Sequence, residues 1–323
     1  MLAAVRAVAS PLRQLGAFVR LGRPLFLTGG FVLYGLGAAV AAHLGARGEA
    51  PAAINWVRFA WGQLAITATQ LMTHYCNDYF DLAADRANTT PTRWSGGSRV
   101  LTAGELPRSV ALRAALILAA VAVAATIFLV ARAGAARSVA LWLAATLFLS
   151  WEYSAPPMRL HSTGWGELDV AVVVSCLTPI IGFLLQAGRL SPLPFLAVAP
   201  PCCLQFAMLL SIEFPDAAGD AATGKRTLVV RFGAPWAANL YQAALLATYI
   251  LLPALVFAGL PIGVALAALI PAPIAFWQLV RMRRGAWRDP RQWESLAFWS
   301  VALLILTSAA ELCAFVLLQV PKR

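Results

Sequence analysis

Nine long apolar runs dominate this sequence and restrict the folds open to it. A helix that crosses a bilayer needs about 20 apolar residues, and the runs have about that length. Strands of a membrane barrel would instead alternate polar and apolar positions, which these runs do not. We therefore predict an all-α, polytopic transmembrane helical bundle. The expected spans are residues 25–45, 57–77, 109–131, 138–155, 166–187, 192–214, 236–258, 261–281 and 295–318.

The composition agrees with a membrane protein. Hydrophobic residues make up 60% of the chain and charged residues only 12%, where soluble domains carry about 25% charged residues. No polar linker long enough to separate two domains interrupts the sequence, so residues 1–323 are expected to form a single transmembrane domain. Residues 1–24 mix arginines with apolar residues and lack the cleavage pattern of a signal peptide. They predict an amphipathic helix at the cytoplasmic interface.

The basic residues predict the orientation of the bundle. With the N-terminus cytoplasmic, 18 of the 25 Lys and Arg residues fall in cytoplasmic segments and 7 fall outside, as the positive-inside rule requires. The net charge of +11 is therefore interpreted as a topology signal, and nucleic acid is not expected as a partner. The five cysteines show no metal-ligand spacing and are interpreted as small apolar helix residues.

Acidic residues are rare, and five of the 14 fall in two short stretches. Asp78, Asp81 and Asp85 have the spacing i, i+3, i+7, which predicts one face of a helix. Asp216 and Asp220 are four residues apart and also predict a shared face. The stretches end the second and sixth expected spans, so both are predicted to emerge on the cytoplasmic side.

Carboxylates gathered at a membrane boundary repel one another and need a compensating cation. Hard oxygen ligands, with no His or Cys at a suitable ligand spacing, suit Mg²⁺ or Ca²⁺, and Mg²⁺ in particular binds through one or two carboxylates plus substrate phosphate. Arg86, Lys225 and Arg226 follow the two acidic stretches closely. Cations beside such carboxylates favour an anionic ligand such as a diphosphate.

At these residues the sequence resembles the UbiA superfamily of intramembrane prenyltransferases. The motif N-D-x-x-D-x-x-x-D of that superfamily matches residues 77–85, and its motif D-x-x-x-D matches residues 216–220. Residues 96–101, 153–160 and 224–231 are most similar to the 1,4-dihydroxy-2-naphthoate polyprenyltransferases of the menaquinone branch. The segment Glu213-Phe214-Pro215 departs from the paired asparagines often found there in that branch.

The resemblance implies a Mg²⁺-dependent transfer of a polyprenyl group from polyprenyl diphosphate to an aromatic acceptor in quinone biosynthesis. It implies that Asp78, Asp81 and Asp85 hold one magnesium ion and that Asp216 and Asp220 hold a second. The favoured acceptor is 1,4-dihydroxy-2-naphthoate, and the implied location is a bacterial inner membrane with the active site at the cytoplasmic face. The other expected substrate-binding residues are Asn77, Arg86, Lys225, Arg226, Tyr153, Arg159 and Arg23.

Several alternatives stay open on the sequence. Arg23 and Arg159 are also explained as topology charges, and Tyr153 as an aromatic residue at the membrane interface. His74 is interpreted as a packed polar residue rather than a base. The acceptor could instead be 4-hydroxybenzoate or another compound. Two other functions also stay open. An isoprenoid cyclase on the same scaffold would need no acceptor, and a cation-coupled transporter would carry its acidic residues in the middle of its spans.

Overall fold

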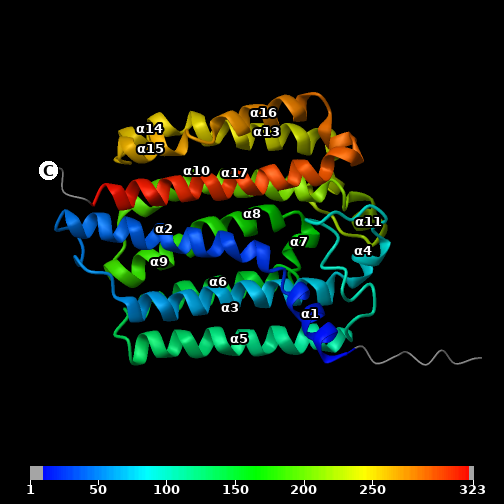
Figure 1. Ribbon diagram of the computed structural model, residues 1–323, viewed down its shortest axis with the longest axis horizontal. Coiled ribbons are helices and arrows are strands. Elements are labelled where there is room, and N and C mark those ends of the chain that lie inside the picture. The colour runs from blue at the N-terminus through cyan, green and yellow to red at the C-terminus, as the bar shows by residue number, and fades with distance from the viewer. Residues whose placement is uncertain (1–9, 320–323) are drawn as a thin grey trace, which may run out of the picture.

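The computed structural model describes residues 10–319, and in that range it holds helices and turns but no strand. The all-α prediction is confirmed. The longer helices, except for the oblique α1, run side by side along the longest axis of the molecule (Figure 1). They are α1 (Pro11–Leu21), α2 (Leu27–Ala46), α3 (Trp56–Phe80), α5 (Arg108–Ala131), α6 (Arg137–Glu152), α9 (Thr178–Ala187), α10 (Pro192–Glu213), α13 (Ala234–Ile250), α16 (Ala272–Arg283) and α17 (Pro290–Leu317).

Short helical elements join or extend these long helices. The segment from α8 (Gly166–Val170) through the π-helical turn η2 (Ala171–Leu177) continues directly into α9. The other short elements are η1 (Pro24–Phe26), α4 (Leu82–Ala87), α7 (Leu160–Thr163), α11 (Ala217–Ala222), α12 (Leu228–Phe232), α14 (Leu252–Phe257), α15 (Ile262–Ala268) and η3 (Ala286–Arg288).

The helices match the positions of the predicted spans, but not all of them are equally apolar. Among the described residues, six helices are long and apolar enough to cross a membrane, or seven if α15 and α16, bent by 43°, form one span. The expected spans 57–77 and 138–155 correspond to α3 and α6, which fall short of that measure. Helix α6 has only 16 residues, and α3 carries a run of polar residues toward its C-terminal end. The count of nine and the cytoplasmic N-terminus stay predictions.

Helix α1 covers the predicted interfacial segment from Pro11 onward, and residues 1–9 lie outside the described part of the chain. Its apolar residues divide between two environments. Ala17 and Leu21 are buried, whereas Leu12 and Leu15 are exposed on the surface of the helix. An exposed apolar stripe beside arginines is the pattern of a helix that lies on a membrane surface.

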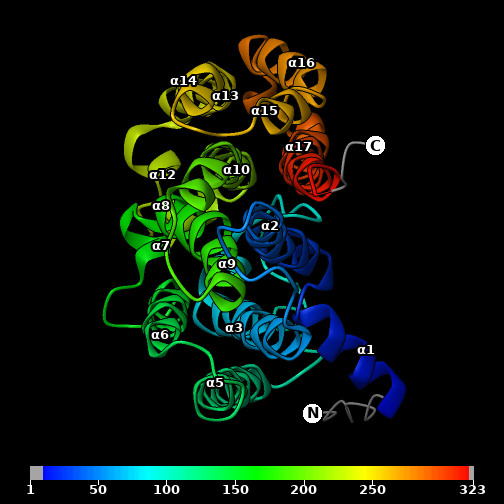
Figure 2. The ribbon, with the colours of Figure 1, turned by 90° about the vertical axis from the view of Figure 1, so that its left-hand side faces the viewer.

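Small residues allow the central helices to pack closely. Viewed nearly end-on, α2 and α9 cross near the middle of the bundle, with α13 and α16 at one edge and α5 at the other (Figure 2). A Cβ atom at Gly37 would lie 1.8 Å from the carbonyl oxygen of Pro179, and one at Gly182 would lie 2.4 Å from that of Tyr34. Close backbone approach at small residues is the usual basis of helix association in membranes.

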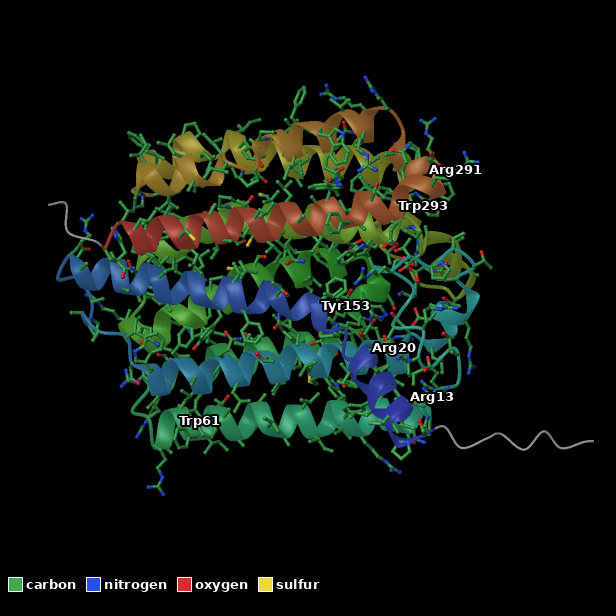
Figure 3. The ribbon with its side chains drawn as sticks, in the orientation of Figure 1. Arg13, Arg20, Trp61, Tyr153, Arg291 and Trp293 are labelled. Carbon is green, nitrogen blue, oxygen red and sulfur yellow. The ribbon has the colours of Figure 1, made fainter. Side chains whose placement is uncertain are left out.

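One end of the bundle gathers the short helices and the positive charge. Helices α4, α7 and α11 lie at this end, together with the long connection between α4 and α5 (Figure 1). The labelled Arg13, Arg20 and Arg291 also lie there, whereas Trp61 lies toward the opposite end (Figure 3). Both acidic stretches are therefore brought to the end that the basic residues mark.

The Gly37 contact predicts a stability defect. Gly37→Ala places a methyl group against a backbone oxygen that cannot rotate away, so overpacking should destabilise the bundle by about 1–3 kcal/mol. At roughly 2–4 °C per kcal/mol, thermal unfolding in detergent should begin measurably earlier. Gly263→Ala in α15 is the matched control, because its Cβ meets only the tip of Leu318, at 4.0 Å. Equal melting temperatures for the two variants would contradict this packing.

Candidate active site

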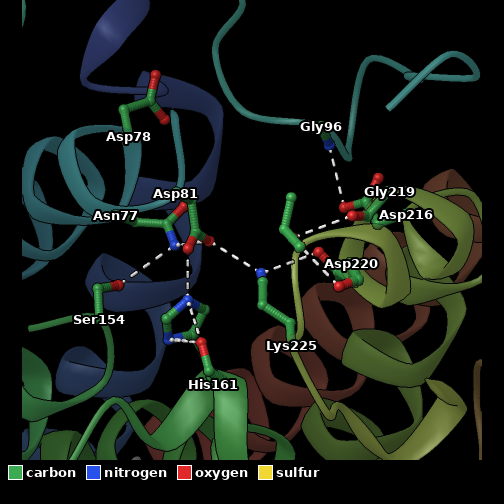
Figure 4. A network of polar contacts seen from close by, with 12 residues as sticks. Asn77, Asp78, Asp81, Gly96, Ser154, His161, Asp216, Gly219, Asp220 and Lys225 are labelled. Atoms are coloured by element: carbon green, nitrogen blue, oxygen red, sulfur yellow. Dashed lines mark hydrogen bonds and ion pairs between the residues drawn. The ribbon is translucent and has the colours of Figure 1, made fainter. Parts of the chain in front are cut away.

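The first acidic stretch does not form one continuous helix. Helix α3 ends at Phe80, and Asp81 stands at the junction with α4, with φ −90° and ψ 2°. Asp78 points away from the contacts of Asp81 (Figure 4). Helical hydrogen bonds still join the Asp81 N–H to the Asn77 carbonyl and the Asp85 N–H to the Asp81 carbonyl. The helix is thus interrupted at Asp81, and the shared face of Asp78, Asp81 and Asp85 stays a prediction.

The Asp78 carboxylate is bound by other groups of the protein. The Arg23 guanidinium donates to Asp78 Oδ1 at 2.6 Å, and both the backbone N–H and the hydroxyl of Ser98 donate to the same carboxylate. Only 2% of Asp78 is exposed. Arg23, which has a left-handed φ of 47°, thereby ties the segment before α2 to the end of α3 and to the loop that carries Ser98.

Asp81 lies at the centre of a polar network (Figure 4). It accepts from His161 Nε2 at 2.5 Å, from Asn77 Nδ2 at 2.9 Å and from Lys225 Nζ at 3.0 Å. Burial alone would raise the pKa of Asp81, but the Lys225 ammonium and the His161 imidazole hold it well below its usual value. Asp81 is therefore ionised, as a cation ligand has to be.

The second acidic stretch faces the first across the same end of the bundle. Asp216 precedes α11 and accepts from Asn88 Nδ2 at 2.6 Å and from the Gly96 backbone N–H at 3.1 Å. Asp220, one turn later on α11, lies 3.1 Å from Lys225 Nζ. Lys225 therefore bridges the two stretches, and the two carboxylates raise the pKa of its ammonium despite burial.

Asp85 is the exception in the cluster, because it has no cationic partner. None of the described residues donates a hydrogen bond to its carboxylate. Burial, together with the negative charges of Asp78, Asp81 and Asp216, raises the pKa of Asp85 to about 8 in spite of Arg23. Burial and Asp220 also raise the pKa of Asp216 to about 6. The negative charge of an ionised Asp85 carboxylate is thus the least compensated in the cluster.

These groups open onto one cavity that runs between the helices. Its volume is about 210 Å³. Its acidic end is lined by Asp81, Asp85, Asp216 and Asp220 together with Lys225 and Arg23, and the remainder of its wall is largely apolar. The apolar lining comes from Leu25, Phe26, Val170, Val173, Val174, Met208, Leu209, Ile212, Val301, Leu304 and Ile305.

The other predicted site residues divide into two groups. Asn77, Tyr153 and Arg23 line the cavity, as does His74, whose ring lies 5.8 Å from that of Phe26. The remaining cations are exposed and do not line it: Arg86, Arg159 and Arg226. Their predicted substrate contacts stay predictions that these positions do not support.

Sequence reasoning did not single out three residues that complete the site. His161 binds Asp81 through Nε2 and the Tyr153 carbonyl through Nδ1, Asn88 binds Asp216, and Ser98 binds Asp78. Each lies close to a segment that was noted: His161 follows residues 153–160, Asn88 follows Asp85 by three positions, and Ser98 stands in residues 96–101. Their partners come from distant segments, so only the fold reveals the pairing.

The donors at the acidic end fit a hard divalent cation. They are carboxylate oxygens, and the half-buried Asp85 carboxylate forms no ion pair with the described residues. Among residues 10–319, no three His, Cys, Asp or Glu side chains converge closely enough to hold an ion by themselves. This is the situation in which Mg²⁺ binds, because it takes one or two carboxylates and completes its shell with water and substrate phosphate.

The fold and the site define a helical membrane protein with an acidic cavity at one end of its bundle. A model of the UbiA prenyltransferase family matches residues 35–302. The chain therefore belongs to the UbiA prenyltransferase family. The resemblance seen in the two acidic motifs is confirmed at the level of the family.

Individual relatives agree with this assignment. The 1,4-dihydroxy-2-naphthoate octaprenyltransferase of Bacillus subtilis (strain 168) is 25% identical over 194 residues, which are 59% of this chain and 60% of that protein. This chain therefore spans less than two thirds of the length of that curated relative.

Solved structures share the fold. A UbiA homolog from Archaeoglobus fulgidus bound to DMAPP and Mg²⁺ superposes with a TM-score of 0.63 at 16% identity, covering 91% of this chain and 98% of that one. A digeranylgeranylglyceryl phosphate synthase gives 0.64 at 12% identity, covering 94% and 99%. At these identities the likeness shows the shared fold alone, and the fold does not select an acceptor.

The contact between Asn88 and Asp216 predicts a loss of activity. Asn88→Ala removes the amide that orients this carboxylate, and losing such an outer partner of a cation ligand typically costs about 10–100-fold. Prenyl transfer by membranes that contain the variant should fall by that factor. Asn239→Ala, at an exposed position of α13, is the matched control and should keep full activity. An Asn88 variant as active as the control would remove Asn88 from the site.

Proposed function

We propose that this chain transfers a polyprenyl group from polyprenyl diphosphate to an aromatic acceptor of quinone biosynthesis, in a magnesium-dependent reaction. The favoured acceptor is 1,4-dihydroxy-2-naphthoate. Residues 1–323 act as one domain in a bacterial inner membrane, with the active site at the cytoplasmic face. The observation that carries the proposal is a single cavity with both acidic stretches at one end and an apolar wall beyond them.

The two parts of the cavity match the two parts of a prenyl diphosphate. The acidic end, with Lys225 and Arg23 among its lining residues, is where the diphosphate would lie. The apolar lining between α2, α10 and α17, which includes Phe26, Met208 and Leu304, suits a hydrocarbon chain. Such a wall also excludes water from the allylic carbon, which protects a developing carbocation from hydrolysis.

The acidic residues would hold magnesium together with the diphosphate. Asp81 and Asp85 would serve one ion, and Asp216 and Asp220 a second, because all four line the cavity. Magnesium held by these residues would supply positive charge to neutralise the leaving diphosphate. The relative from Archaeoglobus fulgidus described as bound to DMAPP and Mg²⁺ supports this choice. Asp78 is hydrogen-bonded to Arg23 and Ser98. It would therefore position the Arg23 guanidinium and would not contact the substrate.

Lys225 has a defined part in this proposal. Its ammonium lies 3.0 Å from Asp81 and 3.1 Å from Asp220, where it balances the two carboxylates. With those carboxylates engaged by divalent cations, the Lys225 ammonium would donate a hydrogen bond to the departing diphosphate, as cations do at phosphoryl leaving groups.

The acceptor assignment rests on similarity. The relative at 25% identity is named for dihydroxynaphthoate, and residues 96–101, 153–160 and 224–231 resemble that branch. Tyr153 lines the cavity next to the network of Asp81 and His161. A hydroxylated ring is also the electron-rich partner that an allylic cation needs.

The position of the acids argues against a cation-coupled transporter. Asp81 follows the last residue of α3, Asp85 lies on the short helix α4, and Asp216 follows the end of α10. A transporter places its coupling-ion site near the middle of its spans. Acids at helix ends, beside a lysine that bridges them, suit the binding of a charged substrate group at the membrane boundary.

A loss of turnover is predicted for the acidic residues. Removing the charge by Asp→Asn at Asp81, Asp85, Asp216 or Asp220 should lower prenyl transfer by on the order of a hundredfold or more, the scale for losing transition-state charge stabilisation. Exhaustive chelation should abolish it, and Mg²⁺ should restore it. Asp289→Asn is the control, since Asp289 caps α17 away from the cavity and Asn caps equally well. Full turnover in the chelated enzyme would rule out this mechanism.

The acceptor is tested with membranes and a labelled polyprenyl diphosphate. Dihydroxynaphthoate, hydroxybenzoate and homogentisate are supplied separately, and one reaction receives no acceptor. We expect label in a prenylated naphthoate product. Product from hydroxybenzoate or a glycerol phosphate, with none from dihydroxynaphthoate, would contradict the acceptor assignment but leave the family assignment intact. A cyclised isoprenoid formed without acceptor would overturn acceptor transfer altogether.

A further inference from the structure

Three arginines gather on one side of the bundle at its acidic end, outside the cavity. Arg159 directly precedes α7, Arg226 lies shortly before α12, and Arg231 lies on α12. All three side chains are exposed, and none forms an ion pair within the described residues. In the end-on view, α7, α8 and α12 lie along the same side, between α6 and α13 (Figure 2). The protein itself thus leaves these charges unneutralised.

Backbone contacts hold the two segments that carry these arginines against each other. The Arg226 N–H donates to the Ser162 carbonyl at 2.9 Å, and the Ser162 N–H donates to the Arg159 carbonyl at 2.8 Å. A Cβ atom at Gly164 would lie 3.2 Å from the Arg226 carbonyl oxygen and 3.6 Å from Arg231 Nη1. Arg226 and Arg231 therefore meet at the turn that joins α7 to α8.

Exposed aromatic side chains border the arginines. Trp165 directly precedes α8, Phe232 ends α12, and Trp236 lies in the first turn of α13. The rings of Phe232 and Trp236 lie 4.6 Å apart, and the Arg231 guanidinium lies 5.3 Å from the Phe232 ring. We call this surface the basic side face, and it is formed by Arg159, Trp165, Arg226, Arg231, Phe232 and Trp236.

The tryptophans indicate the depth of the basic side face in the membrane. Trp165 directly precedes the apolar helical segment Gly166–Ala187, and Trp236 lies at the start of Ala234–Phe257. Tryptophan at the ends of apolar helices marks the membrane–water interface, and arginine side chains at that level extend toward the lipid headgroups. The neighbours of this face are therefore lipid phosphates.

The charges of the basic side face favour an anionic lipid. Residues 153–170 and 222–240 contain two acidic residues, Glu167 and Asp169, and both are buried. No carboxylate of these segments competes for the arginines at the surface. A guanidinium binds phosphate through two parallel hydrogen bonds. A zwitterionic lipid carries its own ammonium beside the phosphate, so a lipid without that ammonium matches the face better.

The segments behind the basic side face support the acidic end of the cavity. Lys225, whose ammonium bridges the two acidic stretches at 3.0 and 3.1 Å, directly precedes Arg226. His161, which contacts Asp81, lies on α7 two residues after Arg159. A ligand that holds the outer side of both segments therefore also fixes Lys225 and His161 on the inner side.

We propose that the basic side face binds the phosphate of an anionic phospholipid, and that the bound headgroup stabilises the segments that carry Lys225 and His161. The lipid binding depends on the face alone. Its coupling to the cavity rests on the proposed diphosphate site, because Lys225 and His161 act there. The composition of the surrounding leaflet thereby changes the affinity for the prenyl donor.

Lipid binding is measured by thermal shift on the full-length protein in detergent. The probes are dioleoyl phosphatidylglycerol, dioleoyl phosphatidylcholine and glycerol 3-phosphate, which carries the phosphate without acyl chains. At a tenfold excess over its dissociation constant, phosphatidylglycerol should raise the melting temperature by roughly 3–6 °C. The other two probes at the same concentration should raise it by less than about 1 °C. An equal shift with glycerol 3-phosphate would show a site for free phosphate and overturn the lipid site.

Two matched double variants test the arginines. Arg226→Gln with Arg231→Gln should weaken phosphatidylglycerol binding by about thirtyfold, since each surface arginine contributes roughly a factor of five toward an anionic leaflet. Arg132→Gln with Arg137→Gln removes two exposed charges where α5 is joined to α6, at the opposite end of the bundle (Figure 1). This control should keep the wild-type shift. An equal loss in both double variants would reduce the effect to general charge and overturn the site.

The coupling is measured as the affinity for Mg²⁺ and a non-reactive prenyl thiolodiphosphate in nanodiscs. Discs of phosphatidylcholine alone are compared with discs that also contain phosphatidylglycerol. Phosphatidylglycerol should lower the dissociation constant by about fivefold or more, the lower range of coupling between two sites. In the Arg226 and Arg231 double variant the two kinds of disc should give equal constants. General repulsion between an anionic leaflet and a diphosphate would act in the opposite direction.

The outcomes separate this inference from the proposed function. Equal stabilisation by both lipids, as a face that docks a soluble protein would give, overturns the lipid site. A double variant that keeps the lipid shift but loses thiolodiphosphate affinity in both discs assigns the arginines to the substrate and also overturns it. If the double variant does not fold, Arg159→Gln tests the same face through one charge. A protein that binds no thiolodiphosphate in either disc overturns the proposed diphosphate site, while the lipid shift still decides the face.

Discussion

The mutual repulsion of carboxylates gathered in a buried cavity is the constraint on which the rest of this structure depends. Asp81 and Asp220 come from distant parts of the chain and meet at the same end of the bundle. Their charges are held together by one ammonium, that of Lys225, at 3.0 and 3.1 Å. Asp85 receives no such compensation, and its carboxyl has a raised pKa as a result. The fold thus builds a site that only a further cation completes.

The helical scaffold makes this arrangement possible by leaving the ends of α3 and α10 open. After α3, Asp81 precedes the short helix α4, which carries Asp85. After α10, Asp216 precedes the short helix α11, which carries Asp220. The loop after α4 crosses between them, with Asn88 and Gly96 on Asp216 and Ser98 on Asp78. Close packing at Gly37 and Gly182 fixes the helices beneath.

The sequence predicted the helical class and the two acidic stretches well, because apolar length and rare carboxylates are local signals. It did not predict the interruption at Asp81, because nothing in the spacing of the aspartates reveals where α3 ends and α4 begins. His161, Asn88 and Ser98 escaped notice for a different reason. Each is an ordinary polar residue in its own segment, and its importance comes from neighbours brought in by tertiary packing. Arg86, Arg159 and Arg226 show the converse, since proximity in sequence did not bring them into the cavity.

The central claim is that the acidic end binds diphosphate only together with divalent cations. It is tested most directly by measuring the binding of a non-reactive prenyl thiolodiphosphate to the purified protein, with and without Mg²⁺. Linkage requires that each ligand raise the affinity for the other by the same factor. The account predicts tight binding with Mg²⁺, weak binding after chelation, and an equal gain in Mg²⁺ affinity when the diphosphate is present. Equal affinity for the diphosphate in both conditions would contradict it.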